Sequence, residues 1–183
     1  MVAPKNTNSD AAGRQAARLA HQPHAGITIS HNSEPIVILL VDDDPDCRLL
    51  IRDAIDDCKV SNKVYEAANG AEALEFLMQR GRFKGVPVPG LVYLDIEMPG
   101  MDGQETLRQI RSHAQFREIP VVMMTGVSDE QQMKVAAANG ANSYTIKPAN
   151  AEQFLRTVLA STNYWLTIHQ SPQHHLRPED CRR

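Results

Sequence analysis

The chain has 183 residues, of which 42% are hydrophobic and 22% charged, so it can bury one core of ordinary domain size and has the composition of a soluble globular protein. Its net charge of −3 conceals a more acidic middle, because residues 35–161 carry 13 Lys and Arg against 18 Asp and Glu, which argues against a nucleic-acid-binding surface. The longest apolar run, at 36–41, is far shorter than the roughly 20 residues of a membrane span, and the N-terminus lacks the apolar core of a secretory signal, so we expect a cytoplasmic protein that binds neither DNA nor membranes.

The first segment of the chain, residues 1–33, is rich in Asn, Ser, Ala, Gln, Pro and His and contains few large apolar side chains. It cannot bury enough surface to offset the entropy lost on ordering. We therefore predict a flexible N-terminal extension at 1–33, a folded domain at 34–161 and a C-terminal tail at 162–183.

Strand and helix patterns alternate through the predicted domain. The predicted strands lie at 36–41, 64–68, 91–95, 120–125 and 143–146. The predicted helices lie at 45–58, 71–80, 103–113, 128–139 and 151–161. Three of the strands are continuously apolar, as in strands buried on both faces. Strict alternation predicts an α/β fold, a doubly wound parallel sheet of five strands with five helices on its two faces.

Local signals mark several helix ends. Asp44 is expected to cap the first helix, with Pro45 at its first position, and Ser128 is expected to cap the fourth. Gly81 and Gly140 are expected to end the second and fourth helices.

Polar side chains follow four of the five predicted strands. In parallel sheets of this type ligands bind outside the carboxyl ends of the strands. The first strand ends in three acids, the third in one acid, the fourth in a hydroxyl followed by glycine, and the fifth in an ammonium group followed by proline. In chain order these residues are Asp42, Asp43, Asp44, Asp95, Thr125, Gly126, Lys147 and Pro148.

This ordered set resembles the receiver domain of two-component response regulators, and the resemblance extends from about Ile36 to Ser161. The signature combines the acidic pair, the Asp followed by MPGMDG, the Thr-Gly pair and the Lys-Pro pair. It implies a flavodoxin-like fold with strand order 2-1-3-4-5. It also implies a phosphoacceptor that receives a phosphoryl group from a sensor histidine kinase or a histidine phosphotransfer protein.

The resemblance assigns the acids to a metal site. Asp95 is expected to be the phosphoacceptor, and Mg²⁺ is the expected cofactor. Asp43 and Asp95 would bind the cation directly and Asp42 through water, and the backbone carbonyl of Glu97 would complete the protein ligands. A hard divalent cation with oxygen ligands suits phosphoryl transfer, which depends mainly on positioning and charge neutralisation.

The other strand-end residues receive roles beside the phosphoryl group. Lys147 would pair with Asp95 and later with a phosphoryl oxygen, and Thr125 would donate to another oxygen. Gly126 would leave the site open. Tyr144 would act as a switch that follows Thr125 inward.

Each of these residues alone also has a purely structural explanation. Three aspartates form many solvated loops, Thr125 suits a strand, Lys147-Pro148 is an extended dipeptide, and Tyr144 could be a half-buried strand residue. The complete set at one sheet edge favours the functional interpretation, whereas Asp44 keeps the structural role of a helix cap.

The C-terminal part suggests a narrower resemblance. Tyr164-Trp165-Leu166 and the long loop before the third strand resemble the small response regulators paired with bacterial phytochromes. Two interpretations of this aromatic segment stay open, a hydrophobic lid on the last helix and an exposed dimer patch.

Only 22 residues follow Ser161, so we expect a single-domain regulator that signals by contact with a downstream protein. We do not expect an enzyme, because the chain would catalyse only its own phosphorylation and slow autodephosphorylation. A homodimer through the helix at 128–139, the strand at 143–146 and the helix at 151–161 stays open. Two alternatives are a constitutive receiver-like interaction module and a Mg²⁺-dependent aspartyl-phosphate phosphatase. The complete set argues against the first, and the position of LDIEMPG on the third strand argues against the second.

Overall fold

The computed structural model describes residues 36–56, 62–147 and 150–167, so the predicted extension at 1–33 and the tail from 168 onward lie outside the described residues. The strands within these ranges are β1 (Val37–Val41), β2 (Lys63–Ala67), β3 (Leu91–Asp95), β4 (Val121–Thr125) and β5 (Ser143–Ile146). The α-helices are α2 (Pro45–Asp56), α3 (Gly70–Leu77), α4 (Gly103–Ser112), α5 (Glu130–Ala138) and α6 (Ala151–Thr167). Two short 3₁₀ helices, η1 (Gly81–Phe83) and η2 (Ala114–Phe116), complete the elements.

The five described strands form one parallel sheet in the order β2-β1-β3-β4-β5, which confirms the predicted fold class. The chain changes its winding direction between β1 and β3, the point at which doubly wound sheets open a crevice at their carboxyl ends. Val41 of β1 pairs with Leu94 of β3, so the next residues along, Asp42 and Asp95, lie at the same edge.

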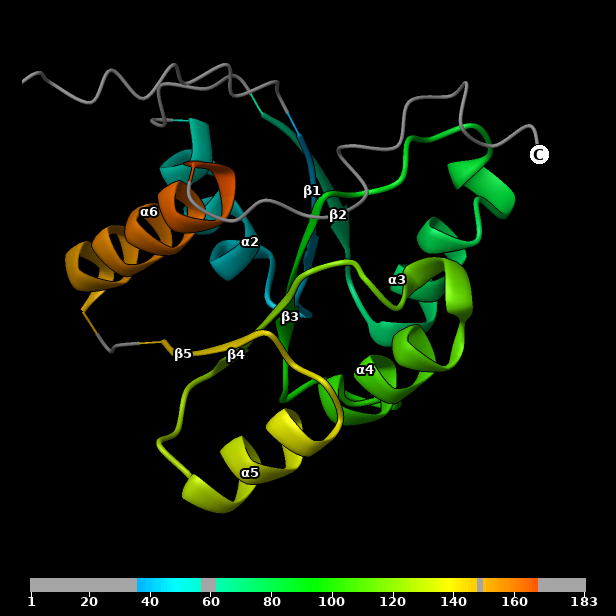
Figure 1. The fold of residues 1–183 in the computed structure, drawn as a ribbon. Helices are drawn as coiled ribbons and strands as arrows, with labels where there is room; N and C mark the ends of the chain where they lie inside the picture. Colours follow the sequence, from blue (N-terminus) through cyan, green and yellow to red (C-terminus); the bar gives the residue numbers. More distant parts are fainter. Residues whose placement is uncertain (1–35, 57–61, 148–149, 168–183) are drawn as a thin grey trace, which may run out of the picture. The chain divides into compact units, whose positions relative to one another are not determined.

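Helices cover both faces of the sheet. Figure 1 shows α2 and α6 on one side of the strands and α3 and α4 on the other. Alternate residues of β1 serve the two faces, as the two-residue period of a strand requires. Leu39 and Val41 belong to the buried cluster with α3, α4 and α5, and Ile38 and Leu40 to the cluster with α2 and α6.

Of the four predicted helix ends, two agree with the structure and two differ. Gly140 follows the end of α5 with a left-handed φ of 89°, as a glycine that closes a helix should. Asp44 accepts a hydrogen bond from the backbone N–H of Asp46 at 2.9 Å, as a cap of α2 should. The cap of α5 is Asp129 and not Ser128, because the Asp129 carboxylate accepts the N–H groups of Gln131 and Gln132.

The predicted end of α3 was also wrong. The helix ends at Leu77, and Gln79 rather than Gly81 takes the first left-handed conformation, with φ of 53°. The N–H of Arg80 then reaches the carbonyl of Glu75 at 2.8 Å, which is the closing bond of a Schellman motif. A polar non-glycine residue can fill this position at a modest cost, so the glycine signal misplaced the boundary.

The last helix is longer than predicted, since α6 continues past 161 to Thr167. Thr162 is buried and its hydroxyl shares a 2.9 Å hydrogen bond with that of Tyr93 on β3. Trp165 is buried in the cluster shared with α2, as the lid interpretation requires, whereas Tyr164 is 48% exposed. The side chain of Leu166 lies outside the described part.

Among the described residues, no helix combines the length and apolar character needed to cross a membrane.

Candidate functional site

Three carboxylates meet at the carboxyl ends of β1 and β3. Asp42 follows β1 and is fully buried, Asp95 ends β3 and is 5% exposed, and Asp43 is exposed in the loop before α2. Oxygen atoms of the three side chains lie within 4.8 Å of one another. The structure therefore brings together the three acids that the sequence proposed as metal ligands.

Asp42 is held by several hydrogen bonds. Its Oδ1 atom accepts the N–H of Asp44 at 2.9 Å, and its Oδ2 atom accepts a hydrogen bond from Nζ of Lys147 at 2.6 Å. Its own N–H donates to the carbonyl of Ala67 on β2 at 3.2 Å. Both carboxylate oxygens are thus already engaged, which makes this buried charge tolerable.

Lys147 follows the edge strand β5 and reaches both buried carboxylates of the site, those of Asp42 and Asp95. Its ammonium nitrogen lies 3.0 Å from Oδ1 of Asp95 as well as 2.6 Å from Asp42. Burial alone would lower the pKa of Lys147, but the hydrogen bond to Asp42 and the charges of Asp42 and Asp95 raise it above its usual value. The side chain is therefore a permanent cation at neutral pH.

Asp95 combines burial with incomplete hydrogen bonding. Its Oδ1 atom is buried and accepts no hydrogen bond of normal geometry, although Lys147 lies within ion-pair distance. Burial raises the pKa of Asp95 to about 6, with the attraction of Lys147 opposing and the repulsion of Asp42 adding to the rise. The charge of Lys147 therefore offsets only part of the cost of burying this carboxylate beside Asp42.

These features fit a hard divalent cation. Three carboxylates face one ammonium group, and a buried oxygen of Asp95 has an unused lone pair. Oxygen ligands of this kind are those that Mg²⁺ and Mn²⁺ prefer. Glu97 lies two residues after Asp95 with an exposed side chain, and its carbonyl stays a predicted ligand.

The two proposed switch residues lie on neighbouring strands, Thr125 at the end of β4 and Tyr144 on β5. Thr125 ends β4 and is fully buried, and its hydroxyl oxygen accepts the N–H of Val127 at 3.2 Å. Tyr144 pairs with Met123 in the sheet, two residues before Thr125 along β4. Burial raises the pKa of Tyr144, whose hydroxyl oxygen lies near the Thr125 side chain but makes no hydrogen bond of normal geometry. The two side chains are therefore neighbours, and their role as a switch stays a prediction.

Two neighbours of the site were not singled out from the sequence. Cys47 is half-buried in the first turn of α2, where burial, followed by contact with Asp42, raises the pKa of the thiol to about 12. Arg48 donates from Nη1 to the carbonyl oxygen of Asp42 at 2.6 Å. The two residues lie three and four positions after Asp44, about one helical turn, and this place beside the acidic run is the signal that could have identified them.

Comparisons with known proteins agree with these features. The family model described as "Response regulator receiver domain" matches residues 38–159. The chain is 35% identical over 140 residues to the "Probable methanogenesis regulatory protein FilR2" of Methanothrix harundinacea, covering 76% of this chain and 89% of that protein. It is 28% identical over 135 residues to the response regulator Rcp1 of Synechocystis sp., covering 74% and 92% of the two chains.

Solved structures give the same result. The phosphorylated cyanobacterial phytochrome response regulator RcpA superposes with a TM-score of 0.72 at 30% identity, covering 75% of this chain and 99% of that chain. The Mn²⁺-bound form of Rcp1 superposes with a TM-score of 0.71 at 28% identity, with the same coverage of 75% and 99%. The resemblance to small phytochrome-associated regulators that the sequence indicated is therefore confirmed.

Proposed function

Because the chain belongs to the response regulator receiver family, we propose that it is a phosphoacceptor in two-component signalling and that Asp95 is the phosphorylated residue. The observation that carries the choice of Asp95 is its buried, unsatisfied Oδ1 atom at the strand end, with Lys147 at 3.0 Å. Receiver domains are in general signalling proteins and not enzymes, so we propose no catalysis beyond the protein's own phosphorylation and slow dephosphorylation.

The proposed reaction transfers a phosphoryl group from a phosphohistidine of a sensor kinase or phosphotransfer protein. A carboxylate oxygen of Asp95 attacks phosphorus, an O–P bond forms, and the P–N bond breaks with its electron pair returning to the imidazole nitrogen. Lys147 keeps its hydrogen bond to Asp42 while its charge also faces the new phosphoryl oxygens. Thr125 accepts a hydrogen bond through its oxygen, so its O–H remains able to donate to the phosphoryl group.

The acidic residues would hold Mg²⁺. The bound cation would supply the positive charge that three carboxylates and a phosphoryl group require. Asp43 and Asp95 are proposed as direct ligands and Asp42 as a ligand through water, because both oxygens of Asp42 already accept hydrogen bonds. The carbonyl of Glu97 is the fourth proposed protein ligand.

We propose that the phosphorylated protein signals by contact with a downstream protein, or with a second copy, through the face formed by α5, β5 and α6. Met133, Val135 and Ile146 support this choice, because they are large apolar side chains that remain at least 38% exposed. The receiver domain is proposed at 34–161, and α6 continues beyond this range, with Trp165 packed on the same core.

One experiment separates these proposals from the alternatives. Incubation with Mg²⁺ and acetyl phosphate should raise the intact mass by one phosphoryl group, and Asp95→Asn should abolish the adduct. Asp53→Asn, which removes an exposed carboxylate of α2, should leave it unchanged. No adduct on the wild-type chain would support a constitutive interaction module, and repeated release of phosphate from a phosphate monoester would support a phosphatase.

A further inference from the structure

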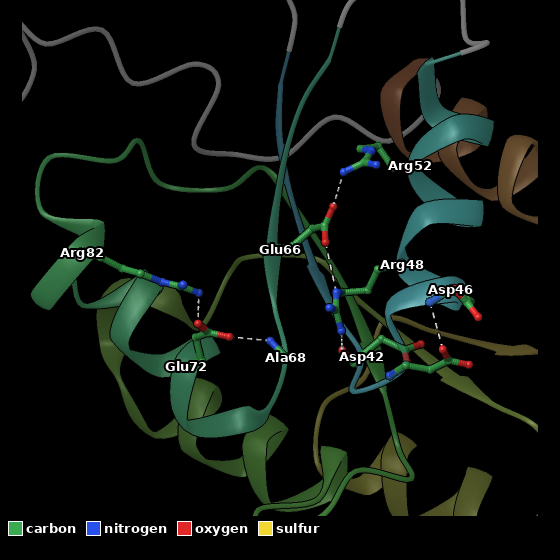
Figure 2. Close-up of polar contacts among 9 residues, drawn as sticks. Asp42, Asp46, Arg48, Arg52, Glu66, Ala68, Glu72 and Arg82 are labelled. Atoms are coloured by element: carbon green, nitrogen blue, oxygen red, sulfur yellow. Dashed lines mark hydrogen bonds and ion pairs between the residues drawn. The ribbon is translucent and has the colours of Figure 1, made fainter.

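Two ion pairs and a hydrogen bond connect the surface of α2 to the backbone carbonyl of Asp42, at the end of β1 (Figure 2). Nη1 of Arg48 donates to the carbonyl oxygen of Asp42 at 2.6 Å, and Nε of the same side chain donates to Oε2 of Glu66 at 3.0 Å. Nη1 of Arg52 donates to the other carboxylate oxygen of Glu66 at 2.7 Å. We call these three residues, Arg48, Glu66 and Arg52, the arginine clamp.

The clamp is better shielded than an ordinary surface ion pair. The side chain of Arg48 is 15% exposed and that of Glu66 is 31% exposed. Each oxygen of Glu66 accepts from a different arginine one helical turn apart, so the carboxylate fixes the direction of Arg48. A fixed guanidinium can point two donors at two targets at once, which a single ammonium group on a flexible stem cannot do in the same geometry.

The carbonyl that Arg48 binds belongs to the peptide group between Asp42 and Asp43. The N–H of Asp42 is bound by Ala67, and its carboxylate is bound by Asp44 and Lys147. The carbonyl of Asp42 is bound instead by Arg48 of α2, which Glu66 of β2 orients. Since the peptide group is planar, holding this oxygen also fixes the N–H of Asp43 and the backbone direction there. The Asp43 side chain is exposed, so its direction depends on the backbone and not on packing.

We propose that Arg48, oriented by Glu66 and Arg52, is a positioning residue for the divalent-cation site, acting through the peptide group that joins Asp42 and Asp43. This inference rests on the proposed function, since it concerns the same cation. Arg48 contacts the Asp42 backbone and none of the reacting atoms, so it is not a catalytic residue. Its role is to hold the two carboxylates in the arrangement that binds the cation.

The decisive variant is Arg48→Lys, which keeps the positive charge near the acids and removes the two-pronged geometry. Mn²⁺ alone is the probe, and free Mn²⁺ in a titration is measured by electron paramagnetic resonance. We expect the dissociation constant of Arg48→Lys to rise about tenfold, the lower end of the effects of residues that orient metal ligands. Glu66→Gln should raise it less, because the amide retains one acceptor oxygen. The matched control is Arg156→Lys, at an exposed pair on α6, which should not change it.

Two further readouts distinguish positioning from simple stabilisation. In the metal-free protein, amide exchange of Asp44, whose N–H is bound by Asp42, should become faster in Arg48→Lys. At saturating Mg²⁺, the phosphorylation rate with acetyl phosphate should return to near the wild-type value.

An unchanged dissociation constant in Arg48→Lys would overturn the inference, even if urea unfolding showed a less stable protein. A wild-type chain that neither binds Mn²⁺ nor takes up a phosphoryl group would instead overturn the proposed function. A chain that binds the cation normally in every variant would leave the proposed function standing and remove Arg48 from it.

Discussion

The ammonium group of Lys147 donates a hydrogen bond to the buried carboxylate of Asp42 at 2.6 Å, across 105 residues of chain. This bond joins the end of β5 to the end of β1, two strands that β3 and β4 separate in the sheet. Lys147 was expected to pair with Asp95, and it does lie 3.0 Å from that carboxylate, but its hydrogen bond is to Asp42. Lys147 can therefore keep one partner while Asp95 changes its charge.

The first prediction concerns the stability of this pair. Lys147→Met should lower the free energy of unfolding by about 3 kcal/mol in the presence of EDTA, because it leaves the buried Asp42 carboxylate without its charged partner. Urea denaturation measures the change. Lys134→Met, which breaks an exposed pair with Glu130, should cost less than about 1 kcal/mol. Equal losses of unfolding free energy in the two variants would mean that the buried pair of Lys147 and Asp42 stabilises the fold no more than an exposed pair does.

The second prediction concerns ligand-linked stability. Millimolar Mg²⁺ should raise the melting temperature, because a ligand that binds only the native state stabilises it, by about 2.7 kcal/mol at one hundred times its dissociation constant. Asp43→Asn should reduce the shift, and since Asp43 is exposed this variant should fold as well as the wild type. A melting curve that Mg²⁺ leaves unchanged would contradict the assignment of the three acids to a cation site.

Much of this arrangement could be predicted because it depends on short-range patterns. The apolar runs and their spacing predict five parallel strands, and the polar residues that follow them must then share one edge. The partner of Arg48 could not be predicted, because Glu66 lies on another strand and only the packing of α2 against β2 brings the two together. The same holds for the preference of Lys147 for Asp42, which depends on side-chain directions at a crowded edge. The end of α3 was missed for a local reason, namely that Gln79 takes a conformation usually left to glycine.

The third prediction concerns pH. The pKa of Asp95 is raised to about 6 from an ordinary value of 3.8, so the native metal-free protein binds this proton more tightly than the unfolded chain does. The stabilisation that protonation brings is full below about pH 4 and is lost as the pH rises through about 6. Asp95→Asn cannot ionise, so its unfolding free energy relative to the wild type should rise between pH 4 and pH 7. Urea unfolding of both proteins in EDTA over this range measures it, and a difference that does not vary with pH would refute the assigned shift.

The last prediction compares two glycines that flank the acceptor. A Cβ atom at Gly103 would stand 2.1 Å from the carbonyl oxygen of Asp95, so the start of α4 or the end of β3 must move in Gly103→Ala. This variant should lose about 2 kcal/mol of unfolding free energy and phosphorylate more slowly.

A Cβ atom at Gly126 would meet only Oε2 of Glu97, at 3.8 Å, and the Gly126 backbone has no positive φ. Gly126→Ala should therefore keep its stability to within about 0.5 kcal/mol, while its methyl group narrows the space beside Thr125 and reduces the yield of the acetyl phosphate adduct. If both variants lost stability equally, the close approach of α4 to Asp95 would not be what fixes the acceptor. If Gly126→Ala were phosphorylated as fast as the wild type, the open space at Gly126 would have no part in phosphoryl entry.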